Sequence, residues 1–197
     1  MKGVFIVLEG PDGSGTSTQS KLLADALVLE GKDVLLTCEP TDGTIGTFIR
    51  SALQSGEMPN DALQLLFTAD RSWHLENIVL PALREDKTVI SDRYILSTIL
   101  YGSALGIDTV WLESINSNFI APDIQIIALP PFDVCFQRVK KRATADIMEQ
   151  DSIMKKVHRR YVDYSNTHSE LAVIDTSGDK TESLKKILQI VKQTCYK

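Results

Sequence analysis

Short apolar runs alternate along the chain with longer segments in which apolar residues recur every three or four positions. The first run, Val4 to Leu8, is continuously apolar, as expected for a strand that is buried on both faces of a parallel sheet. Four more runs of this kind follow it. The predicted strands cover residues 4–8, 33–37, 88–91, 123–129 and 171–175.

The segments between these strands have the apolar spacing of amphipathic helices. In the first of them, Leu22, Leu23, Ala26 and Leu27 fall on one stripe, and Gly31 is a suitable helix stop. Regular alternation of strands and helices predicts an α/β fold with right-handed crossovers and a mostly parallel sheet. The other predicted helices cover residues 44–55, 59–84, 95–105, 109–118, 132–142 and 152–167, with a last one around 184–191.

Composition and charge narrow the class of protein. The chain has 197 residues, of which 43% are hydrophobic and 24% charged, so we expect one globular domain over residues 1–197. The formal net charge of −5 argues against a nucleic-acid polymer as partner, because such binders carry a basic face. The apolar run at the N-terminus is too short for a signal-peptide core or a membrane span, and the three cysteines lack a paired spacing. A cytoplasmic protein without membrane contact is expected.

The first predicted strand leads directly into a glycine-rich segment and then into a helix. Gly10, Gly15 and Ser17 match the phosphate-loop pattern G-x-x-x-x-G-K-[ST], in which backbone N–H groups and the helix N-terminus hold phosphate oxygens. The Ser17 hydroxyl is placed to bind Mg²⁺. Thr16 stands where the pattern has lysine, so another basic residue has to supply that charge. The predicted ATP-binding residues are Gly10, Pro11, Asp12, Gly13, Ser14, Gly15, Thr16, Ser17 and Thr18.

Four blocks of sequence, in the right order, resemble the thymidylate kinase family over nearly the full chain. One block is the phosphate loop and its trailing Ser-Thr-Gln. The others are Glu39-Pro40, then Leu66-Phe67-Thr68-Ala69-Asp70-Arg71, and then Asp92-Arg93-Tyr94-x-x-Ser97-Thr98-x-x-Tyr101. The resemblance implies a three-layer P-loop NTPase fold, with a five-stranded mostly parallel sheet flanked by helices. It also implies transfer of a phosphoryl group from ATP to dTMP, with Mg²⁺, by a homodimer.

The resemblance assigns roles to residues of the later blocks. Phe67 would stack on thymine and Arg71 would bond the edge of the base, and the two share a helix face because they are four positions apart. Arg93 would hold the phosphate of dTMP, since a guanidinium can bind phosphate oxygens bidentately. Thr98 would face the base, and Tyr101 would exclude a ribose 2′-hydroxyl by its bulk. The remaining predicted dTMP-binding residues are Glu39, Pro40 and Arg50.

The resemblance also implies catalytic and metal-binding residues, with Arg138-x-x-x-Arg142 as a further family landmark at the entry to a lid. Asp12, Arg93, Arg138 and Arg142 are expected to act in catalysis, the last two at the edge of a polar, irregular segment over residues 142–151 that is a candidate lid. Asp92, at the end of a predicted strand, is expected to hold Mg²⁺ together with Ser17.

Some positions depart from the family pattern and leave alternatives open. Besides Thr16, the departures are Cys38, Gly102, and Ile147, which stands where a lid arginine is common. One alternative is a kinase that acts on another pyrimidine nucleotide or on a nucleoside. The other is a nucleotide-binding protein with weak catalysis because Thr16 replaces the loop lysine.

Overall fold

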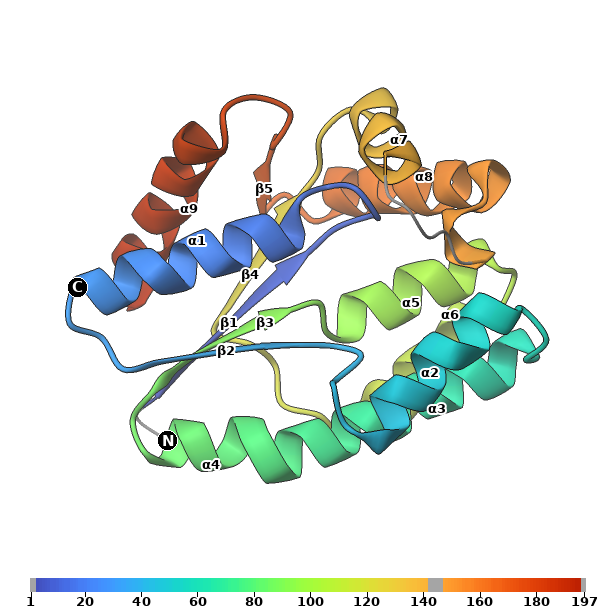
Figure 1. The fold of residues 1–197 in the computed structure, drawn as a ribbon, viewed down its shortest axis with the longest axis horizontal. Coiled ribbons are helices and arrows are strands. Elements are labelled where there is room, and N and C mark those ends of the chain that lie inside the picture. The colour runs from blue at the N-terminus through green and yellow to red at the C-terminus, as the bar shows by residue number, and fades with distance from the viewer. Residues whose placement is uncertain (1–2, 142–146, 196–197) are drawn as a thin grey trace.

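Five parallel strands form a sheet at the centre of the molecule (Figure 1). The computed structural model describes residues 3–141 and 147–195. Every strand pairing is parallel, and Ile6 lies in register between Ile90 and Ile124. The predicted α/β class and all five predicted strands are confirmed. In sheet order the strands are β2 (Val34–Cys38), β3 (Thr88–Asp92), β1 (Val4–Glu9), β4 (Ile124–Ala128) and β5 (Ala172–Ile174).

Helices cover both faces of this sheet, because its strands are apolar on both sides. Ile6 and Leu8 point towards one face, where they pack with α1 (Thr16–Leu29) and α9 (Lys180–Cys195). Phe5 and Val7 point to the other face, where they pack with η1 (Leu75–Val79) and α4 (Leu80–Arg84). Figure 1 shows the resulting three layers, with α1 and α9 above the sheet and α4 below it.

A third apolar cluster lies beyond the carboxyl ends of the strands. It joins residues of four helices, among them Leu63, Leu100 and Val157, all nearly or fully buried. These helices stand to one side of the sheet in Figure 1 and provide the far wall of the site described below. The cluster is formed mainly by α2 (Thr44–Ser55), α3 (Asn60–His74), α5 (Ile95–Ala104) and α8 (Asp151–Thr167), with α6 (Thr109–Asn116) packed against α3 and α5.

Two predicted helices differ in detail from the observed ones. The segment over residues 59–84 is α3, a π-helical turn η1 and α4, joined end to end. Pro81 has no N–H to donate to the carbonyl four residues earlier, which favours a wider turn at this point. The other helix, predicted to end at residue 142, is α7 (Phe132–Lys140). Of the predicted lid, residues 142–146 lie outside the described residues, and the rest begins with a short 3₁₀ turn, η2 (Ile147–Glu149).

Among the described residues, no helix combines the length and apolar character needed to cross a membrane.

Candidate active site

The glycine-rich segment forms a tight loop between β1 and α1. Gly13 and Gly15 have φ angles of 79° and 93°, a left-handed conformation that suits glycine. A Cβ at Gly13 would lie 2.3 Å from the carbonyl oxygen of Cys135, so the backbone could not keep this path with a larger residue. Helix α1 begins at Thr16 without a side-chain cap at Gly15, which leaves its first N–H groups available to an anion.

Two side chains from other elements hold this loop from behind. The Thr176 hydroxyl donates to the Ser14 carbonyl at 2.5 Å. Arg138, on α7, donates from Nη1 to the carbonyls of Gly13 (3.2 Å) and Ser14 (3.4 Å), and from Nη2 to the Thr176 carbonyl at 2.7 Å. Arg138 therefore brings a positive charge against a loop that has Thr16 in place of lysine.

An oxygen-rich pair lies where β3 ends beside the start of α1. The Ser17 hydroxyl donates to Asp92 Oδ2, and the second carboxylate oxygen, Oδ1, is buried without a hydrogen-bond partner among the described residues. A hydroxyl and a carboxylate with a free oxygen are ligands of the type that Mg²⁺ prefers. The residues present therefore fit the metal that a phosphate loop of this kind uses.

Arg93 connects the phosphate loop to a neighbouring cavity. Its backbone has a φ of 73°, which is uncommon for any residue other than glycine. Its guanidinium is held by the Gly10 carbonyl (2.7 Å), by Asp12 Oδ1 (2.5 Å) and by the Ser97 hydroxyl (3.2 Å). It also lies 5.3 Å from the centre of the Tyr101 ring. These contacts aim a fixed cation at the junction between loop and cavity.

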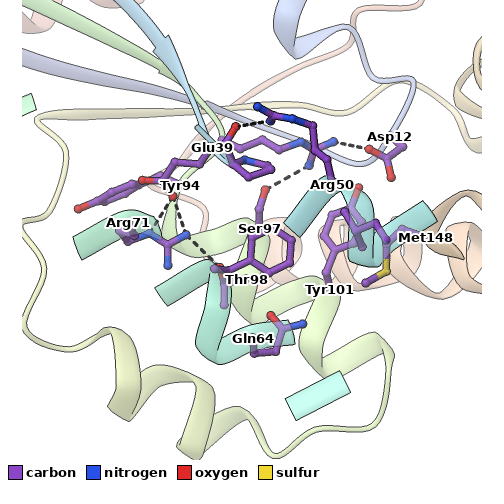
Figure 2. Close-up of a pocket in the computed structure, with 14 residues that line it drawn as sticks. Asp12, Glu39, Arg50, Gln64, Arg71, Tyr94, Ser97, Thr98, Tyr101 and Met148 are labelled. Atoms are coloured by element: carbon purple, nitrogen blue, oxygen red, sulfur yellow. Dashed lines mark hydrogen bonds and ion pairs between the residues drawn. The ribbon is translucent and has the colours of Figure 1, made fainter. Parts of the chain in front are cut away.

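The cavity itself has a volume of about 210 Å³, and Figure 2 shows the residues that line it, with Asp12 at one end. All of the residues predicted to bind dTMP contribute to its wall: Glu39, Pro40, Arg50, Phe67, Arg71, Arg93, Thr98 and Tyr101. Asp12, which was predicted to act in catalysis, also lines the cavity, as do Tyr94 and Ser97, which belong to a family block but were given no role. The sequence did not single out the remaining contributors, Leu53, Gln64 and Met148.

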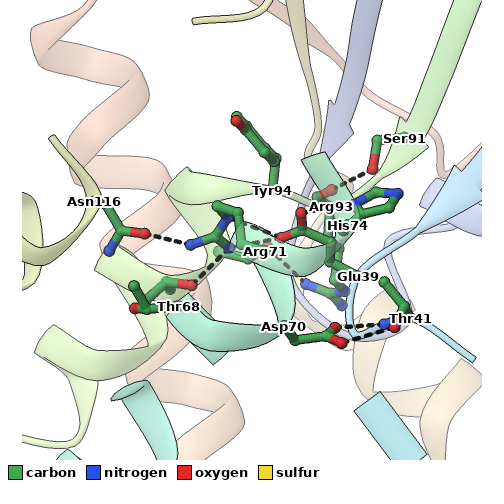
Figure 3. Close-up of polar contacts among 12 residues, drawn as sticks. Glu39, Thr41, Thr68, Asp70, Arg71, His74, Ser91, Arg93, Tyr94 and Asn116 are labelled. Carbon is green, nitrogen blue, oxygen red and sulfur yellow. Dashed lines mark hydrogen bonds and ion pairs between the residues drawn. The ribbon is translucent and has the colours of Figure 1, made fainter. Parts of the chain in front are cut away.

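Arg71 lies at the centre of a buried polar network (Figure 3). Its Nε and Nη2 contact Glu39 Oε2 at 2.9 and 2.8 Å, Nη2 also donates to the Thr98 hydroxyl at 2.9 Å, and Nη1 donates to Asn116 Oδ1. The other carboxylate oxygen of Glu39 is 2.9 Å from Nδ1 of His74. Most donors of Arg71 are therefore used within the protein, and the guanidinium is fixed in the cavity wall.

Arg50 and Asp70 shape the loop that follows β2. Arg50 donates to the carbonyls of Pro40 (2.8 Å) and Thr41 (2.5 Å), and pairs with Asp42 at 2.6 Å. Asp70 is buried and accepts from the backbone N–H and the hydroxyl of Thr41, both at 2.7 Å. The sequence indicated Arg50 by resemblance but gave Asp70 no role.

Glu9 is a buried carboxyl behind Arg93. It accepts from the Tyr94 N–H (2.9 Å) and from the Ser97 hydroxyl (2.5 Å), which fixes the start of α5. Burial raises the pKa of Glu9, and the hydrogen bond from Ser97 opposes part of that rise. An acidic residue that ends an otherwise apolar strand was the available signal for such a group.

The structure brings most predicted site residues to one edge of the sheet. The loop residues, Ser17, Asp92 and Arg93 meet where β1 and β3 end, and the predicted dTMP residues surround the adjoining cavity. Arg142 lies outside the described residues. Ligands of open α/β sheets bind outside the carboxyl ends of the strands, which is where this site lies.

A phosphate loop at the end of β1, a magnesium-type oxygen pair and an arginine-lined cavity on a three-layer parallel sheet define a P-loop phosphotransferase. The model of the family described as thymidylate kinase matches residues 8–187. The chain belongs to the thymidylate kinase family, and it is accordingly a nucleoside monophosphate kinase, an ATP-dependent phosphotransferase.

Archaeal proteins are among its relatives. The chain is 39% identical over 201 residues to a probable thymidylate kinase of Pyrococcus horikoshii, covering 98% of this chain and 97% of the relative. It is 37% identical over 182 residues to a probable thymidylate kinase of Methanocaldococcus jannaschii, covering 92% and 91%. A probable thymidylate kinase of Caldivirga maquilingensis is 33% identical over 191 residues, covering 95% and 93%. The similarity thus extends over nearly the whole of each protein.

Proposed function

We propose that this protein transfers the γ-phosphoryl group of ATP to dTMP, giving dTDP and ADP for dTTP synthesis. The observation that carries this proposal is Arg93, which bonds the Gly10 carbonyl of the phosphate loop and also lines the cavity. A cation shared by both sites can hold the two phosphates that must meet. Three free cysteines and nucleotide substrates support a cytoplasmic location.

Each wall of the cavity suits one part of dTMP. Arg93 binds the acceptor phosphate, and Asp12 keeps its guanidinium in place through their ion pair at 2.5 Å. Phe67 stacks on the base, and Thr98 faces it. Tyr101, which is 9% exposed, fills the space that a ribose 2′-hydroxyl would need.

The chemical step requires positioning and neutralisation of charge more than covalent help from the protein. An oxygen of the dTMP phosphate attacks the γ-phosphorus, while the bond from that phosphorus to the oxygen shared with the β-phosphate breaks. Charge that develops on the transferred group is stabilised by fixed cations and by loop N–H groups that need no reorganisation. Bound Mg²⁺ would neutralise phosphate charge, and Ser17 and Asp92 are the residues that would hold it.

Arg138 is the residue that we assign to the charge missing at Thr16. Its three hydrogen bonds to carbonyls of Gly13, Ser14 and Thr176 hold the guanidinium against the loop. Arg142, whose position is not described, is the second candidate from the predicted lid.

We also infer a homodimer that pairs through an apolar stripe on α3 and α2. Leu65 and Trp73 lie eight positions apart on one side of α3 and are 50% and 42% exposed, while Phe48 on α2 is 53% exposed. A contiguous exposed apolar surface marks an interface, and we propose that these three side chains form such a surface. Leu65→Glu together with Trp73→Glu should give a monomer by light scattering, whereas a wild-type monomer would exclude the dimer.

A coupled assay for ADP tests the activity. Purified protein is given ATP and Mg²⁺ with dTMP, dUMP, dCMP, UMP or thymidine, and dTMP should give the highest kcat/KM. Absence of turnover with dTMP, when another acceptor is turned over, would show that the substrate is wrong. Tight ATP binding without turnover of any acceptor, reversed by Thr16→Lys, would instead identify a nucleotide-binding protein with weak catalysis.

A further inference from the structure

Gln64 is a polar residue of the cavity wall whose side chain has no partner. It lies on α3, is 0% exposed and lines the cavity. Neither Oε1 nor Nε2 has a hydrogen-bond partner among the described residues. Buried amides are nearly always hydrogen-bonded, because an unpaired donor or acceptor loses its water without compensation. An amide with both groups unpaired beside a cavity indicates a partner that enters the cavity.

The position of Gln64 places it at the base end of the site. It precedes Phe67 by three residues and Arg71 by seven, so all three share one face of α3. Its main-chain carbonyl accepts from the Thr68 hydroxyl at 2.9 Å, within a regular helix. In Figure 2, Gln64 lies at the end of the cavity away from Asp12, where the phosphates are expected.

Gly102 provides the room for this amide. A Cβ at Gly102 would lie 3.4 Å from Cδ of Gln64, and only 2.7 Å from a methyl group of Leu112. The amide is therefore packed against bare backbone on α5. Because a glutamine side chain has three rotatable bonds, a small change of its torsion angles can turn the amide from this position towards a ligand.

The polar neighbours of Gln64 in the cavity wall already have hydrogen-bond partners within the protein. Nε and Nη2 of Arg71 bond Glu39 and Thr98, and Nη1 bonds Asn116. The Thr98 hydroxyl accepts one of these bonds. Of the buried side chains that line the cavity within the described residues, Gln64 and Tyr101 have polar atoms without a partner, and of these two only Gln64 carries its donor and its acceptor on separate atoms.

We propose that Gln64 determines base specificity by binding the imide edge of the pyrimidine. Thymine presents an N3–H donor beside a carbonyl acceptor, and a carboxamide is complementary to that pair. Oε1 accepts from N3–H, and Nε2 donates to the adjacent carbonyl. This inference rests on the proposed function, since it assumes that dTMP occupies the cavity with its phosphate at Arg93.

The test compares a change in the protein with a matching change in the substrate. Gln64→Met keeps the length of the side chain and removes both polar groups, while N3-methyl-dTMP lacks the N3–H. For the wild type, we expect kcat/KM to fall about 10- to 100-fold from dTMP to N3-methyl-dTMP, the range of one or two lost hydrogen bonds. Gln64→Met should lower kcat/KM for dTMP by a similar factor, through KM, and leave KM for ATP unchanged.

The decisive quantity is the ratio of kcat/KM for the two substrates. In Gln64→Met this ratio should fall to within about threefold of unity. The variant has already lost the contact to N3–H, so the N3-methyl group of the substrate has no such contact left to remove. A matched control, Gln189→Met at an exposed position on α9, should keep the wild-type ratio. Melting temperatures separate this role from a structural one: Gln64→Met should be at least as stable as the wild type, since it buries no unpaired amide.

Two results would overturn the inference. One is equal use of dTMP and N3-methyl-dTMP by the wild type. This comparison uses no variant, so it does not depend on whether a variant folds. The other is a wild-type ratio that persists in Gln64→Met. Either result, obtained with an enzyme that turns over dTMP, leaves the proposed function intact. A wild type that does not phosphorylate dTMP would refute the proposed function and the inference with it.

Discussion

Removal of the Glu39 carboxylate should destabilise the whole protein. Glu39 and its two partners, Arg71 and His74, are 6%, 1% and 0% exposed. In Glu39→Ala, the guanidinium of Arg71 would stay buried while its Nε loses its acceptor and its charge loses its counterion. The contacts to Thr98 and Asn116 would remain but are neutral. In the folded protein the Arg71 side chain is only 1% exposed, so solvent compensates little for the lost carboxylate.

The expected loss follows from this burial. Removing one partner of a buried ion pair costs about 3–5 kcal/mol. In a protein of this size, 1 kcal/mol corresponds to roughly 2–4 °C, so the melting temperature should fall by about 6–20 °C. The slope of the urea unfolding curve should stay the same, because the change affects the native state and not the surface exposed on unfolding.

Urea and thermal unfolding followed by circular dichroism measure this loss, and two variants calibrate it. Glu30→Ala breaks the pair between Glu30 and Lys192, whose side chains are 41% and 48% exposed, and should cost at most about 1 kcal/mol. Glu39→Leu combined with Arg71→Met removes both charges and should be more stable than Glu39→Ala. If Glu39→Ala cost no more than Glu30→Ala, the argument from an uncompensated buried charge would be refuted.

Four further predictions concern the loop, the metal, Arg138 and pH. Gly13→Ala should abolish ATP binding in a filter or fluorescence assay, because a Cβ there would meet the Cys135 carbonyl at 2.3 Å; Gly31→Ala, at an open turn, is its control. Asp92→Asn should lower kcat by about 100-fold and raise the Mg²⁺ concentration needed for half-maximal rate, and an unchanged Mg²⁺ curve would remove Asp92 from the metal site. Arg138→Met should lower kcat/KM for ATP by about 10- to 1000-fold with little effect on KM for dTMP, whereas an equal effect on both would indicate loss of fold. Burial raises the pKa of Glu9, so its contribution to stability is complete below its ordinary pKa of 4.5 and is lost as pH rises through the folded-state pKa; Glu9→Gln should therefore weaken the fall in unfolding free energy as the pH rises above about 4.5, and an unchanged slope would contradict this.

Features that depend on neighbours in the chain were predictable from the sequence. The central strands β1, β3 and β4 were found because strands covered on both faces are apolar throughout, and the phosphate loop because its backbone path admits only glycine at positions such as Gly13. The residues around the cavity were indicated by family blocks in which each motif lies on one helix or at one strand end. Their local spacing was enough to place Phe67 and Arg71 on one face of α3.

Tertiary structure alone decided how the side chains are used. The order β2-β3-β1-β4-β5 brings Asp92 and Ser17 together, although 75 positions separate them. Arg138 bonds loop carbonyls that lie 124 and 125 positions away, and the sequence had placed it with the lid. Nothing in the sequence indicated that the amide of Gln64 is unpaired. Whether a polar side chain on a helix is buried without hydrogen-bond partners can be seen only when its neighbours in the folded structure are known. Hydrogen-bond partners and burial depend on chain segments that meet only after folding. Apolar periodicity and glycine geometry depend on residues that are close together in the sequence.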